Sequence, residues 1–415
     1  MNNNNSMVAP HSKREIKPDV IFGTAKQAQD AIDKLGFDAV INSTIGAMTD
    51  DNGKLMFLKD VMAHIRNLPE AHLAAYAPIS GVPRYLDKIK EACFRDNKPE
   101  GFIEAVATPG GTGAIKHAVW NYTDMGDKIL TSDWFWAPYE TIASEHGRKI
   151  ETYKFFDENS NYNLASFKEK VNELVDKQDR VLIIINTPAH NPTGFTVEDS
   201  EWEEITNFLK ATAEYTNKKI TLFVDVAYID FAGTTKESRE FMKFFTKLPT
   251  NLLVLVGFSM SKGYTLYGMR SGAIICIAPT KEIATEFENV CSFSNRAAWS
   301  NGTRPAMETL ADIFSDKDLF DAVEGEREEF RLLLDKRART FMDEAKKNNL
   351  VTAPYKAGYF ISVPCTDPVA LCEELKKENL FVIPLAMGIR FAPCAVSEAK
   401  CAASPAIIKM VMDRM

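Results

Sequence analysis

Short runs of β-branched and other apolar residues alternate with longer polar stretches through the middle of the chain. The runs that predict strands are Lys128–Leu130, Arg180–Asn186, Ile220–Val226, Leu252–Gly257 and Gly272–Ala278. Buried runs of this length, separated by helix-like polar stretches, are typical of parallel strands joined by crossover helices. The pattern therefore predicts an α/β fold in which helices cover a mainly parallel sheet.

One helix is expected before most of these strands and another after them. One opens at Thr112–Lys116, directly after a Pro-Gly-Gly turn, and a long charged amphipathic helix covers about Lys317–Asn348. After the long helix come the apolar run Tyr359–Val363, an acidic helix near Val369–Glu378 and the run Leu380–Pro384. These last elements predict a smaller mixed α/β domain.

The length of 415 residues exceeds what one hydrophobic core usually supports, so two domains that share a cleft are expected. We expect residues 56–319 to form a large domain and residues 16–55 and 320–415 a small one. Residues 1–15 begin with an asparagine tract and are expected to be a disordered tail.

Composition narrows the choice of partners. The net charge of −8 is spread over interspersed acids and bases, which argues against nucleic acid or an anionic membrane and favours small-molecule ligands. The apolar runs are much shorter than the roughly 20 residues of a membrane helix, and the first residues lack the apolar core of a signal peptide. The seven scattered cysteines include no Cys-x-x-Cys pair, so neither a metal site nor a disulfide framework is expected. A cytoplasmic location follows as the expectation.

Polar and basic residues follow several of the predicted strands. They are Asn191, Asp225, Tyr228, Lys262 and Arg270. In open parallel sheets, ligands bind beyond the carboxyl ends of the strands. Taken singly, each has an ordinary alternative: Asp225 can cap the next element, Tyr228 can be a half-buried aromatic, and Lys262 can be a solvated loop lysine. Their common position at strand ends predicts a ligand site.

A glycine-rich turn, Gly110-Gly111-Thr112-Gly113, leads into the first expected helix. Backbone amides at such a helix start bind phosphate. The turn is neither a Gly-x-Gly-x-x-Gly dinucleotide motif nor a P-loop, because Gly-Lys-Ser or Gly-Lys-Thr is absent. A turn kept rich in glycine only for close packing is the alternative.

Together these residues resemble the fold type I pyridoxal-phosphate aminotransferases, and within them the aspartate and aromatic aminotransferases. The segment Ser259–Gly272 is similar to the family's cofactor-lysine segment, with a serine three residues before Lys262 and an arginine eight residues after it. His190–Gly194 resembles the family's Asn-Pro-x-Gly turn, and Asp225–Tyr228 its Asp-x-Ala-Tyr segment. The resemblance implies a large domain with a seven-stranded-type sheet and a smaller α/β domain.

The resemblance also implies roles around pyridoxal 5'-phosphate. Lys262 forms the covalent link and acts as the base, Asp225 keeps the ring nitrogen protonated, and Tyr228 completes the catalytic residues. The other expected cofactor contacts are Gly111, Thr112, Trp136, Asn191, Ser259, Ser261, Arg270 and Tyr76. Trp134 is an alternative to Trp136 for stacking on the ring, and Gly110 stands where the aspartate enzymes usually have a serine.

Substrate contacts are implied in the same way. Arg390 is expected to grip the α-carboxylate, for which a planar guanidinium is suited, together with Asn191. Gly46 lies in a segment that resembles the substrate entrance. Arg296 resembles the arginine that binds a distal carboxylate from the neighbouring subunit, with a solvated or interface arginine as the alternative. Tyr76 resembles a tyrosine that reaches the phosphate across the interface, which implies a homodimer with shared active sites.

The expected function is transfer of an amino group from aspartate, glutamate or an aromatic amino acid to a 2-oxo acid, by ping-pong kinetics. A lyase or synthase of the same fold is one alternative, because the fold does not decide the reaction. A non-catalytic regulator that binds pyridoxal phosphate is another. The sequence leaves the preferred amino donor and acceptor open.

Overall fold

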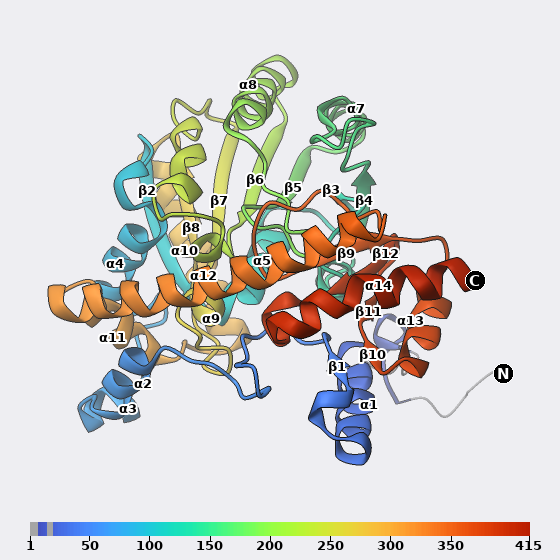
Figure 1. Ribbon diagram of the computed structural model, residues 1–415. Coiled ribbons are helices and arrows are strands. Elements are labelled where there is room, and N and C mark those ends of the chain that lie inside the picture. Colours follow the sequence, from blue (N-terminus) through green and yellow to red (C-terminus); the bar gives the residue numbers. More distant parts are fainter. Residues whose placement is uncertain (1–6, 15–19) are drawn as a thin grey trace.

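The computed structural model describes residues 7–14 and 20–415 (Figure 1). Of the predicted disordered tail, residues 1–6 and 15 lie outside the described residues, and so do residues 16–19 at the start of the predicted small domain. Within the tail, Pro10–Ser12 form a 3-10 helix, η1. None of the helices in the described ranges is long and apolar enough to cross a lipid bilayer.

A seven-stranded sheet forms the centre of the molecule. In spatial order its strands are β2 (Phe102–Thr108), β8 (Gly272–Ala278), β7 (Leu252–Ser259), β6 (Lys219–Asp225), β5 (Arg180–Asn186), β3 (Lys128–Ser132) and β4 (Lys149–Tyr153). The strands from β7 to β4 are parallel to their neighbours, whereas β8 is antiparallel to both β2 and β7. The predicted α/β fold with a mainly parallel sheet of seven strands is therefore confirmed.

Both faces of the sheet are buried, because alternate side chains along each strand point to opposite sides. Ile183, Leu222 and Val254 belong to one core cluster, and Leu182, Phe223 and Leu255 belong to another. The second cluster is covered by α5 (Gly110–Asn121), α6 (Pro138–Glu145) and α10 (Lys281–Ala298). The first is covered by α4 (Pro83–Phe94), α7 (Leu164–Lys177), α8 (Asp199–Thr216), η5 (Glu237–Phe244) and α11 (Arg304–Ile313).

The helix α12 (Lys317–Lys347) runs across the molecule from the large sheet to a second, smaller body of structure (Figure 1). That body contains an antiparallel sheet of β11 (Ile383–Pro384), β12 (Gly388–Phe391) and β9 (Ile361–Pro364). A short parallel pair joins β1 (Ile41–Asn42) to β10 (Leu380–Phe381). The helices α1 (Val20–Leu35), α13 (Pro368–Lys377) and α14 (Glu398–Arg414) pack around these strands.

The remaining elements are short and connect the larger ones. They are η2 (Phe37–Ala39), α2 (Lys59–Arg66), α3 (Glu70–Ala74), η3 (Arg95–Asn97), η4 (Ile229–Phe231), α9 (Met260–Gly263) and η6 (Pro393–Ala395). Two of them follow strands of the large sheet directly, since η4 comes after β6 and α9 after β7. These two turns carry residues of the site described next.

Candidate active site

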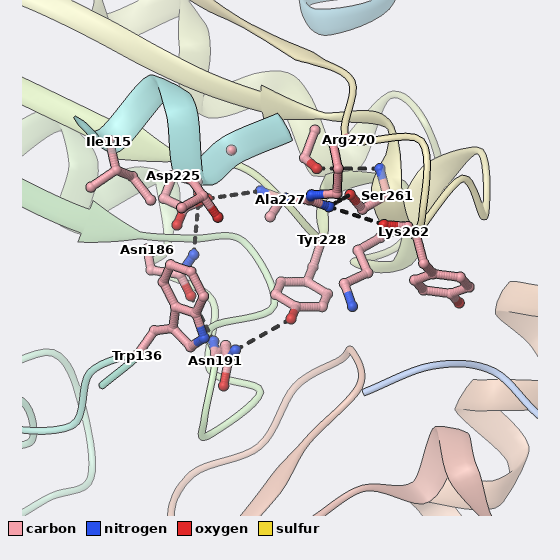
Figure 2. Close-up of a pocket in the computed structure, with 14 residues that line it drawn as sticks. Ile115, Trp136, Asn186, Asn191, Asp225, Ala227, Tyr228, Ser261, Lys262 and Arg270 are labelled. Atoms are coloured by element: carbon pink, nitrogen blue, oxygen red, sulfur yellow. Dashed lines mark hydrogen bonds between the residues drawn. The ribbon is translucent and has the colours of Figure 1, made fainter. Parts of the chain in front are cut away.

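A cavity of about 240 Å³ opens at the carboxyl ends of the central parallel strands (Figure 2). It is lined by ten of the eleven residues expected to contact the cofactor: Gly111, Thr112, Trp136, Asn191, Asp225, Tyr228, Ser259, Ser261, Lys262 and Arg270. Ile115, Asn186, Ala227 and Tyr267 complete the lining and were not predicted. Segments far apart in the sequence thus meet at one edge of the sheet, as the strand-end rule predicts.

One end of the cavity is suited to an anion. The helix α5 begins at Gly110, so the amides of its first turn have no partner within the helix. Arg270 lies beside this helix start, where its Nη1 donates hydrogen bonds to Ser261 Oγ at 3.0 Å and to the Tyr267 carbonyl at 3.0 Å. A cation, serine hydroxyls and a helix N-terminus together make a phosphate-binding end.

The glycine at position 110 has a local physical reason. Its φ is +66°, and a Cβ built on it would lie 2.8 Å from Arg270 Nη2. A serine here would be strained and would displace the guanidinium. The backbone conformation and the close approach of Arg270 thus account for glycine at this position.

Asp225, the last residue of β6, is a buried residue of the cavity lining. Its carboxylate accepts hydrogen bonds from the Tyr139 hydroxyl at 2.7 Å and from the Ala227 amide at 3.2 Å. Burial raises the pKa of Asp225 to about 6, against the hydrogen bond from Tyr139, which lowers it. No cationic side chain in the described ranges forms an ion pair with this carboxylate, so a positively charged donor on a ligand would stabilise it.

Two asparagines and a tyrosine form the adjoining wall. The Asn186 side chain accepts a hydrogen bond from the backbone amide of Asn191 at 2.6 Å and donates one to the backbone carbonyl of Asp225 at 2.9 Å. Asn191 Nδ2 donates to the Tyr228 hydroxyl at 3.3 Å (Figure 2), while its buried Oδ1 has no hydrogen-bond partner in the described part of the chain. Burial raises the pKa of Tyr228, which keeps its hydroxyl protonated. This wall offers neutral donors and an unused acceptor to a ligand.

Lys262 is held in the short helix α9 and points toward the opposite wall. Its Nζ donates a hydrogen bond to the Gly46 carbonyl at 2.5 Å. The rings of Tyr228, Tyr267 and Tyr359 surround the amine, with centroids 5.6, 4.9 and 5.4 Å from Nζ. Burial lowers the pKa of Lys262 to about 8, so a substantial fraction of the amine is neutral and nucleophilic near that pH.

The two candidate tryptophans lie in different places. Trp136 lines the cavity and meets the edge of Tyr139, with centroids 5.6 Å apart and an interplanar angle of 86°. Trp134 is 6% exposed and packs in the core cluster on the α4 and α8 side of the sheet. The geometry therefore favours Trp136 as the aromatic that contacts a ligand ring.

Arg390 and Gly46, the residues expected to contact the substrate, are not among the residues that line the cavity. Arg390 is 4% exposed, donates from Nη2 to the Thr44 carbonyl at 3.0 Å and lies over the Phe360 ring at 4.2 Å. Its buried Nε has no hydrogen-bond partner within the described residues, and burial lowers the pKa of the guanidinium. The Phe360 ring also occupies the space beside Gly46, where a Cβ would meet it at 2.4 Å. A buried guanidinium that forms no ion pair with a described carboxylate is suited to a carboxylate ligand.

Tyr76 and Arg296 are not brought to the cavity within this chain. Tyr76 is 87% exposed. Arg296 is exposed at the end of α10, where its Nη1 donates to Ser300 Oγ at 2.7 Å. Both residues are expected to act across a subunit interface, so a single chain leaves their roles as predictions.

Sequence reasoning missed Tyr139, Asn186 and Tyr267. Asn186 is the last residue of β5, so the strand-end rule that identified Asp225 could have found it. Tyr267 lies five residues after Lys262 and accepts a hydrogen bond from the Met48 amide at 3.1 Å. Tyr139 is in α6 and reaches Asp225 across the sheet edge, a contact for which the sequence carries no local signal.

Comparison with known proteins agrees with this geometry. The family model described as "Aminotransferase class I and II" matches residues 38–403. An aminotransferase structure from Anaerococcus prevotii is 40% identical, with a TM-score of 0.97 over 98% of this chain and 100% of that one. The aspartate aminotransferase of Pseudomonas aeruginosa is 26% identical over 303 residues, which is 70% of this chain and 72% of that protein. An aromatic-amino-acid aminotransferase from Burkholderia pseudomallei, covalently bound to pyridoxal phosphate, is 20% identical with a TM-score of 0.78, over 98% and 100% of the two chains.

Proposed function

Because the chain belongs to the class I and II aminotransferases and is therefore a pyridoxal-phosphate-dependent aminotransferase, we propose that it moves an amino group from aspartate, glutamate or an aromatic amino acid to a 2-oxo acid. The observation that carries the proposal is the arrangement of three groups around one cavity. These are the desolvated amine of Lys262, the carboxylate of Asp225, which has no cationic partner among the described residues, and the start of α5 beside Arg270, which is suited to an anion.

The residues of the cavity fit the cofactor. Arg270, Ser259, Ser261 and the amides of Gly111 and Thr112 would hold its phosphate. Asp225 would pair with the protonated ring nitrogen, Asn191 and Tyr228 would bind the phenolic oxygen, and Trp136 would cover the ring face. Once bound, pyridoxal phosphate supplies an electron sink conjugated to the substrate nitrogen.

The side chains divide the remaining work. Lys262 Nζ takes the proton from the substrate α-carbon, for which a pKa near 8 is close to the working pH of most enzymes. Asp225 holds a negative charge in a buried position, where it stabilises positive charge on its partner most strongly. Because burial raises the pKa of Tyr228, its hydroxyl stays neutral and can donate a hydrogen bond without adding a second negative charge beside Asp225.

Arg390 would bind the substrate α-carboxylate through the guanidinium nitrogens that have no partner in the described residues. We further propose that Arg296 and Tyr76 serve the site of a second subunit in a homodimer, which their exposure permits. The division into a large domain of residues 56–319 and a small domain of residues 16–55 and 320–415 belongs to the same proposal. It is supported by the packing of α12, whose first half belongs to one core cluster and whose second half belongs to another.

Visible absorbance of the purified holoenzyme tests the function directly. The proposal expects the absorbance of lysine-bound cofactor to give way to that of the amino form when glutamate, aspartate or an aromatic amino acid is added, and to return with a 2-oxo acid. Initial rates at several concentrations of both substrates should give parallel double-reciprocal plots, the sign of a ping-pong mechanism. Release of ammonia, or elimination products without a 2-oxo acid requirement, would instead indicate a lyase.

A further inference from the structure

A buried cluster of charges lies behind the turn that carries Lys262, outside the cavity lining. Asp230 in η4 is its centre, with a side chain 4% exposed. Its Oδ1 accepts a hydrogen bond from Arg239 Nη2 at 2.6 Å, and its Oδ2 lies 4.0 Å from Arg327 Nη1. The side chains of these arginines are 1% and 5% exposed. Arg327 also pairs with Glu324. Such a cluster is held in one arrangement, because separating Asp230 from its arginines leaves a charged carboxylate buried without a partner.

The Asp230 carboxylate packs against the backbone of the turn that carries Lys262, called the lysine turn below. A Cβ built on Gly263, the residue after Lys262, would lie 1.9 Å from Asp230 Oδ2. Only a residue without a side chain allows this approach. On the following residue, the Arg327 guanidinium lies over the Tyr264 ring at 5.4 Å. Two members of the cluster thus contact the two residues that come directly after the lysine.

The cluster is in turn fixed to rigid helices. Arg239 donates to the carbonyls of Cys93 at 3.0 Å and Ala92 at 3.3 Å, at the end of α4. Arg327 belongs to α12, ten residues before the fully buried Arg337. Arg337 donates to the Thr49 carbonyl at 2.8 Å, in the segment that also carries Gly46. One helix therefore contacts both the lysine turn and the segment that receives the lysine's hydrogen bond.

We propose that Asp230, held by Arg239 and Arg327, is a positioning residue that fixes the backbone at Gly263 and so directs Lys262 into the cavity. Burial alone would raise the pKa of Asp230, but Arg327 and Arg239 lower it to about 2, so the carboxylate stays charged at any working pH. This role of Asp230 depends on the proposed aminotransferase function only in the experiments that measure turnover. Capture of the cofactor by Lys262 tests it independently.

The test uses three single variants, Asp230→Asn, Asp230→Ala and Gly263→Ala. It also uses the double variant that combines Asp230→Ala with Gly263→Ala. The first readout is the rate at which apoenzyme captures pyridoxal phosphate, followed by visible absorbance. A reacting group misplaced by about 1 Å loses on the order of 100-fold in rate, so each single variant should slow capture by about 10- to 100-fold. In turnover with an amino donor, kcat should fall by a similar factor, while KM stays within about threefold because Arg390 is untouched.

The double variant makes the test specific to contact. In the Asp230→Ala background the two atoms nearest to the added methyl group, Oδ2 at 1.9 Å and Cγ at 2.9 Å, are removed and only the Cβ at 3.2 Å remains. Gly263→Ala should therefore add less than about a twofold further loss of capture rate. Losses that multiply would show that the two residues act separately and would overturn the proposal. Gly263→Ala leaves all three charges in place, so it decides the matter if the Asp230 variants fail to fold.

A matched control separates positioning from general stability. Leu209→Ala removes a fully buried side chain from α8, at the far end of the sheet from the site (Figure 1). It should lower the unfolding midpoint and leave capture and kcat within about twofold of wild type. Asp230→Asn with capture and kcat as fast as this control would overturn the proposal. A wild type that captures cofactor but converts no amino donor would refute the proposed function alone, and capture would still decide the role of Asp230.

Discussion

The buried carboxylate of Asp225 predicts that a variant can be more stable than the wild type and yet fail as an enzyme. The pKa of Asp225 is raised by burial from 3.8 to about 6 in the absence of a cofactor. The folded chain therefore binds this proton more tightly than the unfolded chain, and the resulting stability is lost as the pH rises through about 6. At pH 8 the ionised carboxylate costs up to about 3 kcal/mol of unfolding free energy, at 1.36 kcal/mol for each pKa unit.

Asp225→Asn removes that cost and keeps nearly the same shape. We expect the apoenzyme of this variant to be more stable than wild-type apoenzyme by about 1 to 3 kcal/mol at pH 8, with the gain shrinking toward zero as the pH falls toward 4. Urea denaturation of cofactor-free protein at several pH values measures this. The holoenzyme should lose about 100-fold or more in kcat, because a neutral amide cannot stabilise the protonated ring nitrogen.

Asp230→Asn is the matched control, because it makes the same change in a carboxylate whose pKa is shifted the other way. The pKa of Asp230 is lowered to about 2, so its stabilising effect is present above 3.8 and lost only as the pH falls through about 2. Removing the charge at pH 8 should cost about 2 kcal/mol or more, since Arg239 loses its carboxylate partner and Arg327 keeps only Glu324. If both substitutions destabilise the apoenzyme equally at pH 8, the reasoning about Asp225 is refuted.

Three further predictions concern single side chains of the site. Lys262→Ala should abolish turnover and the visible absorbance of bound cofactor, and an adduct on another lysine after borohydride reduction would contradict the assignment. In wild-type apoenzyme the rate of cofactor capture should rise with pH and level off above about 8, as the amine of Lys262 becomes neutral. Tyr139→Phe deletes a hydrogen bond to a buried charge, commonly about 1.5 to 3 kcal/mol, so kcat should fall by about 10- to 100-fold with KM little changed; unchanged kinetics would exclude Tyr139 from the support of Asp225. Arg296→Ala should lower kcat/KM for aspartate and glutamate by at least about tenfold, or 1.4 kcal/mol, and that for phenylalanine much less; equal losses for both classes would indicate a structural role.

The central strands could be predicted because they are buried on both faces and form continuous apolar runs. The strands of the large sheet that were missed, β2 and β4, are at its two edges, where charged residues such as Glu104 and Glu151 interrupt the pattern. Strand direction could not be predicted either, since apolar periodicity is the same whether β8 runs parallel or antiparallel to β7. The run Leu380–Pro384 proved to be two strands in two different sheets.

The site could be predicted as far as its residues follow strands. Asn191, Asp225 and Lys262 were found because a polar residue after a buried strand is conspicuous in the sequence. Tyr139 was not found because its partner is 86 residues away and its helix gives no sign of which side chain faces the sheet edge. The cluster around Asp230 was missed for a similar reason, because its arginines come from η5 and α12.

The direction of β8 sets the connection that carries the two proposed anchors of the cofactor. Because Ser259 and Gly272 are paired across β7 and β8, the residues between them form a closed loop within the sheet, where a parallel strand would have required a crossover helix. Lys262 and Arg270, the covalent and the ionic anchor, share this loop, so an insertion or deletion in it would move one anchor relative to the other. An engineer who wishes to change the proposed substrate has freedom at Arg296, which is exposed on a separate segment, but not at Gly46, where a Cβ would meet the Phe360 ring at 2.4 Å. The roughly twelve residues of the loop would have to be kept at constant length.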